Sequence, residues 1–324
     1  MYLDHFRMKK EPFGIAPDPE FLWLGHQQAR VFEDLRAGVF DRDGVVILTG
    51  DIGTGKTALV KRVGSQDGVA PVYITVSGPE MNGLDVYHVL AAELHMNRRF
   101  ESREAFIADF MRMLARKYGG YRKVVLIIDE AQRLTREALK DLAVLAGLQS
   151  SGKRLLKVLL VGQLDFDDLA APEINGGALA KIAARCLLEP LAEADTQAYI
   201  AHRLKAAGRD QPLFDDDAVQ TIHALSKGYP RLINIICDHA LLYGYSANLA
   251  LIGGGVIREC SRDLSVALDL EDTPDGRSSP SMAAIEANAG AAPTAGSSAR
   301  SWRSWLYLAG AVATAGAALY LITR

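Results

Sequence analysis

The sequence predicts an α/β fold, in which a parallel sheet with flanking helices is followed by a small all-helical domain. Three observations indicate it. A glycine-rich loop at residues 50–57 joins an apolar run typical of a buried strand to a segment typical of a helix. The run at residues 124–128 is continuously apolar, as in strands buried on both faces of a parallel sheet. After Asp195 the apolar residues recur at helical spacing.

The glycine-rich loop has the full pattern G-x-x-x-x-G-K-[ST] in the strand–loop–helix context that a phosphate-binding loop requires. Its glycines let several amide N–H groups converge on one point, and the helix N-terminus adds partial positive charge there. We expect Lys56 to reach the β- and γ-phosphates of ATP and the Thr57 hydroxyl to bind Mg²⁺. A turn that binds nothing is the disfavoured alternative. The predicted nucleotide-binding residues are Gly50, Asp51, Ile52, Gly53, Thr54, Gly55, Lys56, Thr57 and Ala58.

Residues 1–43 are expected to form an N-terminal strap and a helix. Pro12, Pro17 and Pro19 lie within eight residues and exclude a regular helix, so this segment is predicted to be extended. Residues 25–40 then have apolar side chains at helical spacing. The extended segment could cover the edge of the core, or it could also line the nucleotide base. Composition does not choose between these alternatives.

Polar residues end two further predicted strands. Asp129 and Glu130 follow the apolar run, where burying carboxylates is costly unless a cation needs them. In an ATPase, Asp129 would hold Mg²⁺, directly or through water, and Glu130 would polarise the attacking water. Gln163 follows the strand predicted at residues 155–161. Because parallel strands end at one edge of a sheet, Gln163 is expected near the γ-phosphate as a sensor, the alternative being a strand-end cap.

The remaining elements follow from periodicity. A β-branched run at residues 71–76 predicts a strand, and apolar stripes predict helices at residues 83–97 and 104–117. In the helical region, the third helix begins at Pro230, where the missing N–H costs little, and Arg231 could project from it onto phosphate. The helices predicted there span residues 196–207, 215–227 and 230–248.

Composition sets limits on the class of protein. Hydrophobic residues make up 49% of the chain and charged residues 23%, which is ordinary for a globular protein. The net charge of −3 gives no overall attraction to nucleic acid, although a local basic patch remains possible. The three cysteines, Cys186, Cys237 and Cys260, lack metal-ligand spacing and are expected to be reduced, as in a cytosolic body.

The C-terminal region predicts a membrane anchor. Residues 271–304 are rich in small and polar residues and are expected to form a disordered linker. Residues 305–323 follow as a predicted transmembrane helix, whose uncharged stretch would span roughly 27 Å of a ~30 Å hydrocarbon layer. Arg300 and Arg303 favour a cytoplasmic N-terminal side. The alternative is an alanine-rich helix packed on the body. We therefore expect a single-pass inner-membrane protein with a cytoplasmic body.

Several of these motifs occur together in one order, and the chain resembles a known family over residues 1–268. It is similar to the AAA+ ATPases of the general secretion pathway protein A (ExeA-type) family. The resemblance is carried by the phosphate loop, Asp129-Glu130-Ala131-Gln132, Val161-Gly162-Gln163, Gly228-Tyr229-Pro230-Arg231-Leu232-Ile233-Asn234, and the opening Met1-Tyr2-Leu3-Asp4-His5-Phe6 with Pro12-Phe13 and Pro17-Asp18-Pro19.

The resemblance implies an AAA+ domain at residues 44–192 and a helical lid domain at residues 193–270. It implies that residues 50–57 are the Walker A motif and that the Walker B motif ends at Asp129-Glu130. It further implies that Gln163 is the sensor-one residue, that Arg231 is the sensor-two arginine, and that ATP can sit between subunits of a homo-oligomer.

One departure concerns the arginine that would act on a neighbouring subunit's nucleotide. Where relatives carry Gln-Arg-Ile, this chain has Ala180-Lys181-Ile182, and lysine lacks the planar fork of arginine. Arg185 is then the candidate for this trans-acting finger. Because Lys181 replaces that arginine, fast ATP hydrolysis that depends on oligomer formation is less expected.

These expectations combine into a membrane-anchored ATPase that binds and hydrolyses ATP to drive assembly or operation of an envelope secretion or export system. Its partner would be an inner-membrane secretion or polysaccharide-export component. One alternative is a nucleotide-gated DNA-binding regulator of the transposition or replication-initiation kind, against which the predicted membrane span counts. A second alternative is an ATP-binding scaffold with little turnover, which the departure at Lys181 keeps open.

Overall fold

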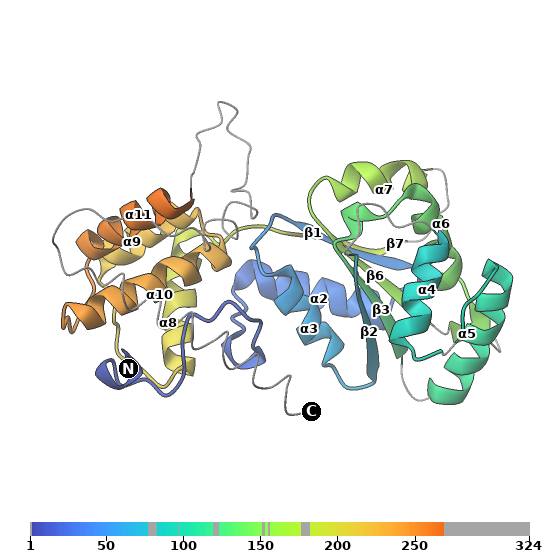
Figure 1. Cartoon of the computed structure of the whole chain (residues 1–324), viewed down its shortest axis with the longest axis horizontal. Helices are drawn as coiled ribbons and strands as arrows, with labels where there is room; N and C mark the ends of the chain where they lie inside the picture. The colour runs from blue at the N-terminus through green and yellow to red at the C-terminus, as the bar shows by residue number, and fades with distance from the viewer. Residues whose placement is uncertain are drawn as a thin grey trace, which may run out of the picture.

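The computed structural model describes residues 2–76, 83–96, 98–118, 123–150, 153–154, 156–175 and 182–268. Its elements form two groups, a sheet with helices on both faces and a purely helical group beside it (Figure 1). The helical group consists of α8 (Glu193–Ala206), α9 (Asp216–Ser226), α10 (Pro230–Ser246) and α11 (Gly254–Leu268). The N-terminus lies next to the helical group rather than next to the sheet.

The sheet is entirely parallel, as predicted, and has the strand order β2-β3-β6-β1-β7. All residues of β1 and β6 are buried, which agrees with their largely apolar sequences, although the buried residues include Lys157 in β6 and Thr49 in β1. A short antiparallel ribbon lies outside this sheet, formed by β4 (Gln149–Ser150) and β5 (Lys153–Arg154). The strands of the main sheet are β1 (Val45–Gly50), β2 (Val69–Thr75), β3 (Lys123–Asp129), β6 (Leu156–Gly162) and β7 (Ile182–Leu188).

Helices cover both faces of the sheet. On one face, α2 (His26–Phe40) and α3 (Lys56–Gly64) contribute Leu35 and Leu59 to a core beneath β1. On the other face, a larger core includes Tyr87 and Phe106. This second face is covered by α4 (Gly83–Glu93), α5 (Arg103–Tyr118), α6 (Arg136–Ala146) and α7 (Phe166–Asn175). The sheet is therefore buried on both sides, as a parallel sheet requires.

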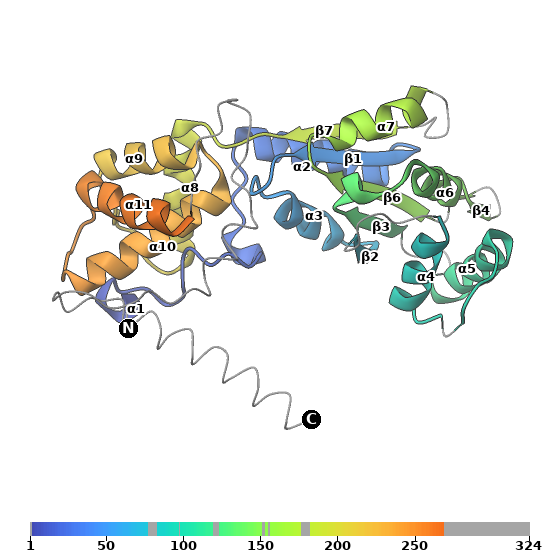
Figure 2. The ribbon, with the colours of Figure 1, turned by 45° about the horizontal axis from the view of Figure 1, so that its top comes forward.

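The helical group has its own hydrophobic core, to which the N-terminal segment contributes. Phe6, Phe13 and Phe21 are buried there among side chains of the helical group. Figure 2 shows α1 (Tyr2–His5) beside the helical group, and Phe21 ends the single-turn helix η1 (Pro19–Phe21).

A buried arginine holds the N-terminal segment against α8. The guanidinium of Arg203 donates to the carbonyl oxygens of Pro12 and Gly14, the latter at 3.1 Å. It also donates to the hydroxyl of Tyr199 at 2.8 Å and lies 5.1 Å from the ring centre of Phe21. Because each nitrogen of this buried guanidinium donates a hydrogen bond, two of them to the segment, the segment between the prolines is held in one extended path.

The predicted strands and helices are present, with ends within a few residues of the expected positions. Among the described residues, nine elements were not predicted, namely α1, η1, η2 (Ala131–Arg133), β4, β5, α6, α7, β7 and α11. The predicted domain boundaries remain expectations. The linker at residues 271–304 and the span at residues 305–323 lie outside the described residues. Among the residues that the structure does describe, no helix has both the length and the apolar character needed to cross a membrane.

Gly228 generates a stability prediction, since it has φ +77° and an added Cβ would lie 2.0 Å from the carbonyl oxygen of Leu191. Its own carbonyl accepts from the Leu191 amide at 2.8 Å. We expect Gly228→Ala to lower the free energy of unfolding by more than about 2 kcal/mol, because a left-handed backbone and a backbone clash both oppose it. Denaturant unfolding of the two proteins measures the difference.

Gly68→Ala is the matched control. Gly68 has φ +81°, but an added Cβ would meet nothing within 4 Å among the described atoms. Its free energy of unfolding should therefore fall by only about 1–2 kcal/mol, the cost of the left-handed conformation for a residue with a Cβ. Equal losses for the two variants would show that the contact with Leu191 is not restrictive.

Candidate nucleotide-binding site

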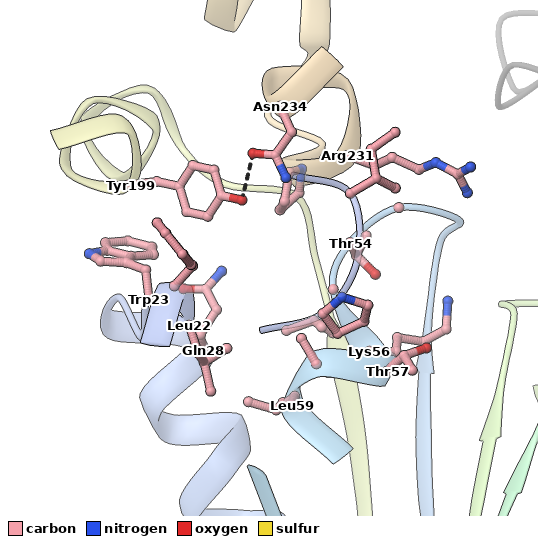
Figure 3. Close-up of a pocket in the computed structure, with 18 of the residues that line it drawn as sticks. Leu22, Trp23, Gln28, Thr54, Lys56, Thr57, Leu59, Tyr199, Arg231 and Asn234 are labelled. Atoms are coloured by element: carbon pink, nitrogen blue, oxygen red, sulfur yellow. Dashed lines mark hydrogen bonds between the residues drawn. The ribbon is translucent and has the colours of Figure 1, made fainter. Parts of the chain in front are cut away.

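The candidate site is a cavity of about 340 Å³ where three parts of the chain meet. The phosphate loop forms one side, the N-terminal segment forms another, and α8 and α10 of the helical group close it (Figure 3). Its volume lies at the lower end of the ~300–1,000 Å³ range typical of small-molecule sites. The sequence predicted the phosphate loop as one wall and left the contribution of the N-terminal segment open.

The loop has the backbone conformation that its glycines allow. Gly53 and Gly55 have φ +83° and +100°, which residues with a Cβ rarely adopt. At Gly50 an added Cβ would lie 2.5 Å from the carbonyl oxygen of Leu188, so a larger residue cannot fit between β1 and β7. Three positions of the motif therefore need glycine for two different reasons, conformation at two and space at the third.

Lys56, at the first turn of α3, is bound by its own loop. Its ammonium donates to the carbonyl oxygens of Gly50 at 2.7 Å and Asp51 at 2.8 Å. Burial lowers the pKa of Lys56, while the nearby carboxylates of Glu130, Asp129 and Asp51 oppose that shift. A phosphate in the cavity would offer this ammonium a charged acceptor in place of two neutral ones.

Thr57 and Asp129 meet across the end of the sheet. The Thr57 hydroxyl donates to Oδ2 of Asp129 at 3.2 Å. These hard oxygen ligands fit Mg²⁺, which usually keeps several waters and takes few protein ligands. Within the described ranges no cluster of three or more His, Cys, Asp and Glu side chains could hold a metal ion. A magnesium ion here would therefore also depend on oxygens of nucleotide and water.

Glu130 is held by two amide side chains. Nε2 of Gln132 donates to Glu130 Oε2 at 2.6 Å, and Nε2 of Gln163 lies 3.5 Å from the same oxygen. Gln132 also accepts from the backbone N–H of Gln163 at 3.2 Å. The structure thus places Gln163 beside Glu130 in the cavity wall, while its predicted position near the γ-phosphate remains an expectation. It also gives a role to Gln132, which belonged to a motif of the family resemblance but was assigned no role from the sequence.

Arg231 and Tyr229 connect the start of α10 with the loop. The Arg231 amide donates to the carbonyl of Gly53 at 3.2 Å, and its side chain lies beside the loop in Figure 3. Nε of Arg231 is buried and has no hydrogen-bond partner among the described residues. The Tyr229 hydroxyl donates to Asp51 Oδ2 at 2.7 Å, and burial together with this bond raises its pKa to about 12. Tyr229 was assigned no role from the sequence, although it stands in a motif of the family resemblance, because its partner Asp51 is 178 positions away.

The N-terminal segment lines the cavity opposite the phosphate loop. Leu22 and Trp23 belong to its wall, and Trp23 packs edge-on to Tyr199 with ring centres 6.2 Å apart. Tyr199 donates to Asn234 Oδ1 at 2.9 Å (Figure 3). Of the two alternatives for this segment, the geometry therefore favours the one in which it reaches the nucleotide.

Arg185 lies away from the cavity. It is on the edge strand β7, half-exposed, and its guanidinium is 2.8 Å from Asp167 Oδ1 on α7. The structure therefore does not bring Arg185 to the nucleotide site of its own subunit. A role in a neighbour's site remains a prediction, and Lys181 lies outside the described residues.

The fold and this site define an AAA+ ATPase. A family model described as an AAA domain matches residues 40–170. Over 267 residues the chain is 33% identical to general secretion pathway protein A of Aeromonas hydrophila, a match that covers 82% of this chain and 49% of that protein. The chain is thus an AAA+ ATPase related to general secretion pathway protein A, which confirms the predicted resemblance. It spans about half the length of this curated relative.

Solved structures agree on the fold. The Cdc6 protein of Pyrobaculum aerophilum superimposes with a TM-score of 0.59 at 20% identity, covering 76% of this chain and 71% of that one. The ORC2 protein of Aeropyrum pernix, solved in ADPNP–ADP complexes, gives a TM-score of 0.55 at 16% identity, with coverage of 75% and 68%. At such identities the similarity establishes the AAA+ fold alone.

Lys56→Ala tests the phosphate loop. Removing a charged donor should weaken ATP binding by at least about tenfold, because charge-assisted hydrogen bonds contribute roughly 1.5–3 kcal/mol. Calorimetric titration with Mg·ATP measures the change. Lys61→Ala, at an exposed position on the same helix, is the control and should bind normally. Wild-type affinity in Lys56→Ala would show that the loop does not bind the phosphates.

Proposed function

We propose that this chain binds Mg·ATP in the cavity, hydrolyses it, and uses the resulting conformational change to operate an envelope secretion or export system. The observation that carries the proposal is the convergence on one cavity of Lys56, Thr57, Glu130, Gln163 and Arg231 from four separate elements. No one or two of these residues would be enough to identify a nucleotide site, because each residue type is common in proteins. Their meeting at the end of a parallel sheet is what a nucleoside triphosphate requires.

The phosphates would lie over the loop between β1 and α3. Backbone N–H groups of the loop and the N-terminus of α3 would donate to them. Lys56 would exchange its bonds to Gly50 and Asp51 for bonds to the β- and γ-phosphates. Arg231, whose Nε is buried without a partner in the described part of the chain, is placed to donate from the opposite side.

Thr57 and Asp129 would hold the metal, directly or through water. Mg²⁺, when bound there, supplies positive charge that screens the phosphates. Asp129 also accepts from the backbone N–H of Glu130 at 3.0 Å, and Glu130 itself adopts a left-handed backbone with φ +59°. Asp129 bonds to Thr57 whereas Glu130 bonds to Gln132 and Gln163, so the two adjacent carboxylates could serve separate purposes.

Glu130 is the general base in this proposal. The amides of Gln132 and Gln163 both approach its Oε2, so we assign Oε1 to the proton of the attacking water. Hydrogen bonds from neutral amides orient the carboxylate without neutralising it. Gln163 lies beside this base and lines the same cavity, which suits a residue that would report whether the γ-phosphate is present.

Changes in the loop would reach the helical group directly. Arg231 and Tyr229 bond to Gly53 and Asp51 through contacts that depend on the path of the loop. When Lys56 leaves the loop carbonyls for phosphate, these contacts can shift and move α10 with them. This route would convert the state of the nucleotide into a displacement of the helical group and of the N-terminal segment packed on it.

The cellular role rests on the relative's name and on the C-terminal sequence. General secretion pathway protein A suggests an inner-membrane secretion or polysaccharide-export component as the partner. We propose that residues 305–323 anchor the chain in the inner membrane, with the ATPase body in the cytoplasm and homo-oligomers in which Arg185 acts on a neighbour. The exposed position of Arg185 on an edge strand is compatible with such a contact. The scaffold alternative differs in having little turnover.

Glu130→Gln tests the base. The amide keeps the shape of the side chain but cannot accept a proton, so hydrolysis should fall at least about tenfold, since general bases contribute ~10²–10⁴. ATP binding should persist. Steady-state phosphate release at several protein concentrations measures the rate, with Glu137→Gln on the exposed face of α6 as the control. An unchanged hydrolysis rate in Glu130→Gln would show that Glu130 is not the general base. If the wild-type protein hydrolyses ATP as slowly as Glu130→Gln, the alternative of an ATP-binding scaffold with little turnover would be supported.

Truncation after Ser301 tests the anchor. The shortened chain lacks the one long uncharged stretch of the sequence and should be recovered in the soluble fraction. Its ATP affinity should remain within about threefold of the full-length value, because every proposed contact precedes residue 269. Hydrolysis should fall if the membrane concentrates subunits. Release of the full-length protein from membranes by high salt or alkaline pH would contradict an integral anchor.

A further inference from the structure

Gln28 lines the cavity but has no role in the mechanism above. It lies on α2, its side chain is 7% exposed, and its Oε1 is buried with no hydrogen-bond partner among the described residues. A buried acceptor without a donor is unfavourable, and such groups in native proteins commonly pair with a ligand. The cavity that Gln28 lines is the available source of that donor.

A chain of hydrogen bonds sets the orientation of this amide. Nε2 of Gln27 donates to Glu189 Oε2 at 2.9 Å, and Nε2 of Gln28 donates to Gln27 Oε1 at 3.2 Å. An ionised carboxylate only accepts, so it selects the nitrogen of Gln27 and leaves the oxygen of Gln27 for Gln28. The nitrogen of Gln28 is thereby directed at Gln27, and the two ends of its amide cannot exchange without losing a bond.

The position of Gln28 identifies the part of the ligand that it would meet. In Figure 3 it lies with Leu22 and Trp23, across the cavity from Lys56 and Thr57. Since Lys56 and Thr57 mark the phosphate end, the far end receives the base. Leu22 and Trp23 supply the apolar and aromatic surface against which a flat base can pack.

We propose that Gln28 selects adenine, with Gln27 and Glu189 as the positioning residues. Oε1 would accept from the exocyclic amino group, and the second N–H of Nε2 would donate to the neighbouring ring nitrogen. This two-bond pairing is the one that glutamine makes with adenine in nucleic acids. Guanine and hypoxanthine carry a carbonyl oxygen in place of the amino group, so two acceptors would face each other. The inference rests on the proposed function, because it requires a nucleotide in this cavity.

The first test needs no substitution. Full-length protein with Mg²⁺ and a ribose-labelled fluorescent ATP analogue is titrated with ATP, ITP or GTP, and displacement gives their relative affinities. ATP should bind at least about tenfold tighter than ITP, which differs from ATP only at the base. Equal displacement by ATP and ITP would overturn the role of Gln28 while leaving the nucleotide site in place. Failure to bind the analogue at all would overturn both this inference and the proposed function.

Two variants then distinguish the role of Gln28, which would contact the base, from that of Gln27, which would position it. Gln28→Met keeps the length of the side chain without its polar atoms. The affinity for ATP should therefore fall about tenfold and approach the affinity for ITP. Gln27→Met removes the acceptor that orients Gln28, so its amide can rotate to suit either base. In that variant the affinity for ITP should rise, while the affinity for ATP should stay within about threefold of the wild-type value. A merely structural role of Gln27 would not produce this outcome.

Arg30→Met is the control, because Arg30 is an exposed residue of the same helix and is absent from the cavity wall within the described residues. It should keep the wild-type ratio of ATP to ITP affinity. A wild-type ratio in both Gln28→Met and Gln27→Met would overturn the proposal. If Gln28→Met does not fold, the ratios of ATP to ITP affinity in the wild-type protein and in Gln27→Met still decide whether the proposal holds.

Discussion

The site depends on the register of the parallel sheet. Pairing of β1 with β6 sets Thr49 opposite Gly162, and pairing of β3 with β6 sets Ile128 opposite Leu160. The residues that follow these strand ends are therefore brought to one edge, where the loop, Asp129 and Gln163 meet. A one-residue slip of β3 would reverse the faces of its side chains and bury a carboxylate in the core. Because β1, β3 and β6 are almost wholly buried, the hydrophobic energy of the core maintains the geometry of the site.

The second half of the site has a different origin. Register explains the loop and the carboxylates, but the wall at the base end depends on long-range packing of the N-terminal segment on the helical group. Arg203 is central to this packing, since it binds two carbonyl oxygens of the segment from within a buried environment. Losing it would leave those carbonyls unpaired in the described core, at a cost of about 1–3 kcal/mol each. The side of the cavity formed by the loop is therefore set by strand pairing, whereas the opposite side is assembled from the N-terminal segment and the helical group.

Local patterns in the sequence predicted the first half of the site but left open whether the N-terminal segment contributes to the second half. The phosphate loop, Asp129 and Glu130 could be predicted because each stands at the end of a recognisable apolar strand. Gln163 followed from the parallel arrangement. Gln132 and Tyr229 stood within motifs of the family resemblance but could not be given a role, and Gln28 could not be identified. Their contacts with Gln163 and Asp51, and the burial of Gln28, follow from the fold rather than from any periodicity. The edge strand β7 was missed for a related reason, since its exposed positions interrupt the apolar run that marks a buried strand.

The contact between Arg203 and Pro12 also bears on how the protein is made. The two residues are separated by 191 positions. At a synthesis rate of about 5–20 residues per second, the ribosome needs roughly 10–40 s to produce the second after the first. During this interval Phe6, Phe13 and Phe21 have no core to enter, whereas the strands of the sheet can already pair. The nascent chain thus carries exposed aromatic side chains in its N-terminal segment until the helical group that buries them has been synthesised.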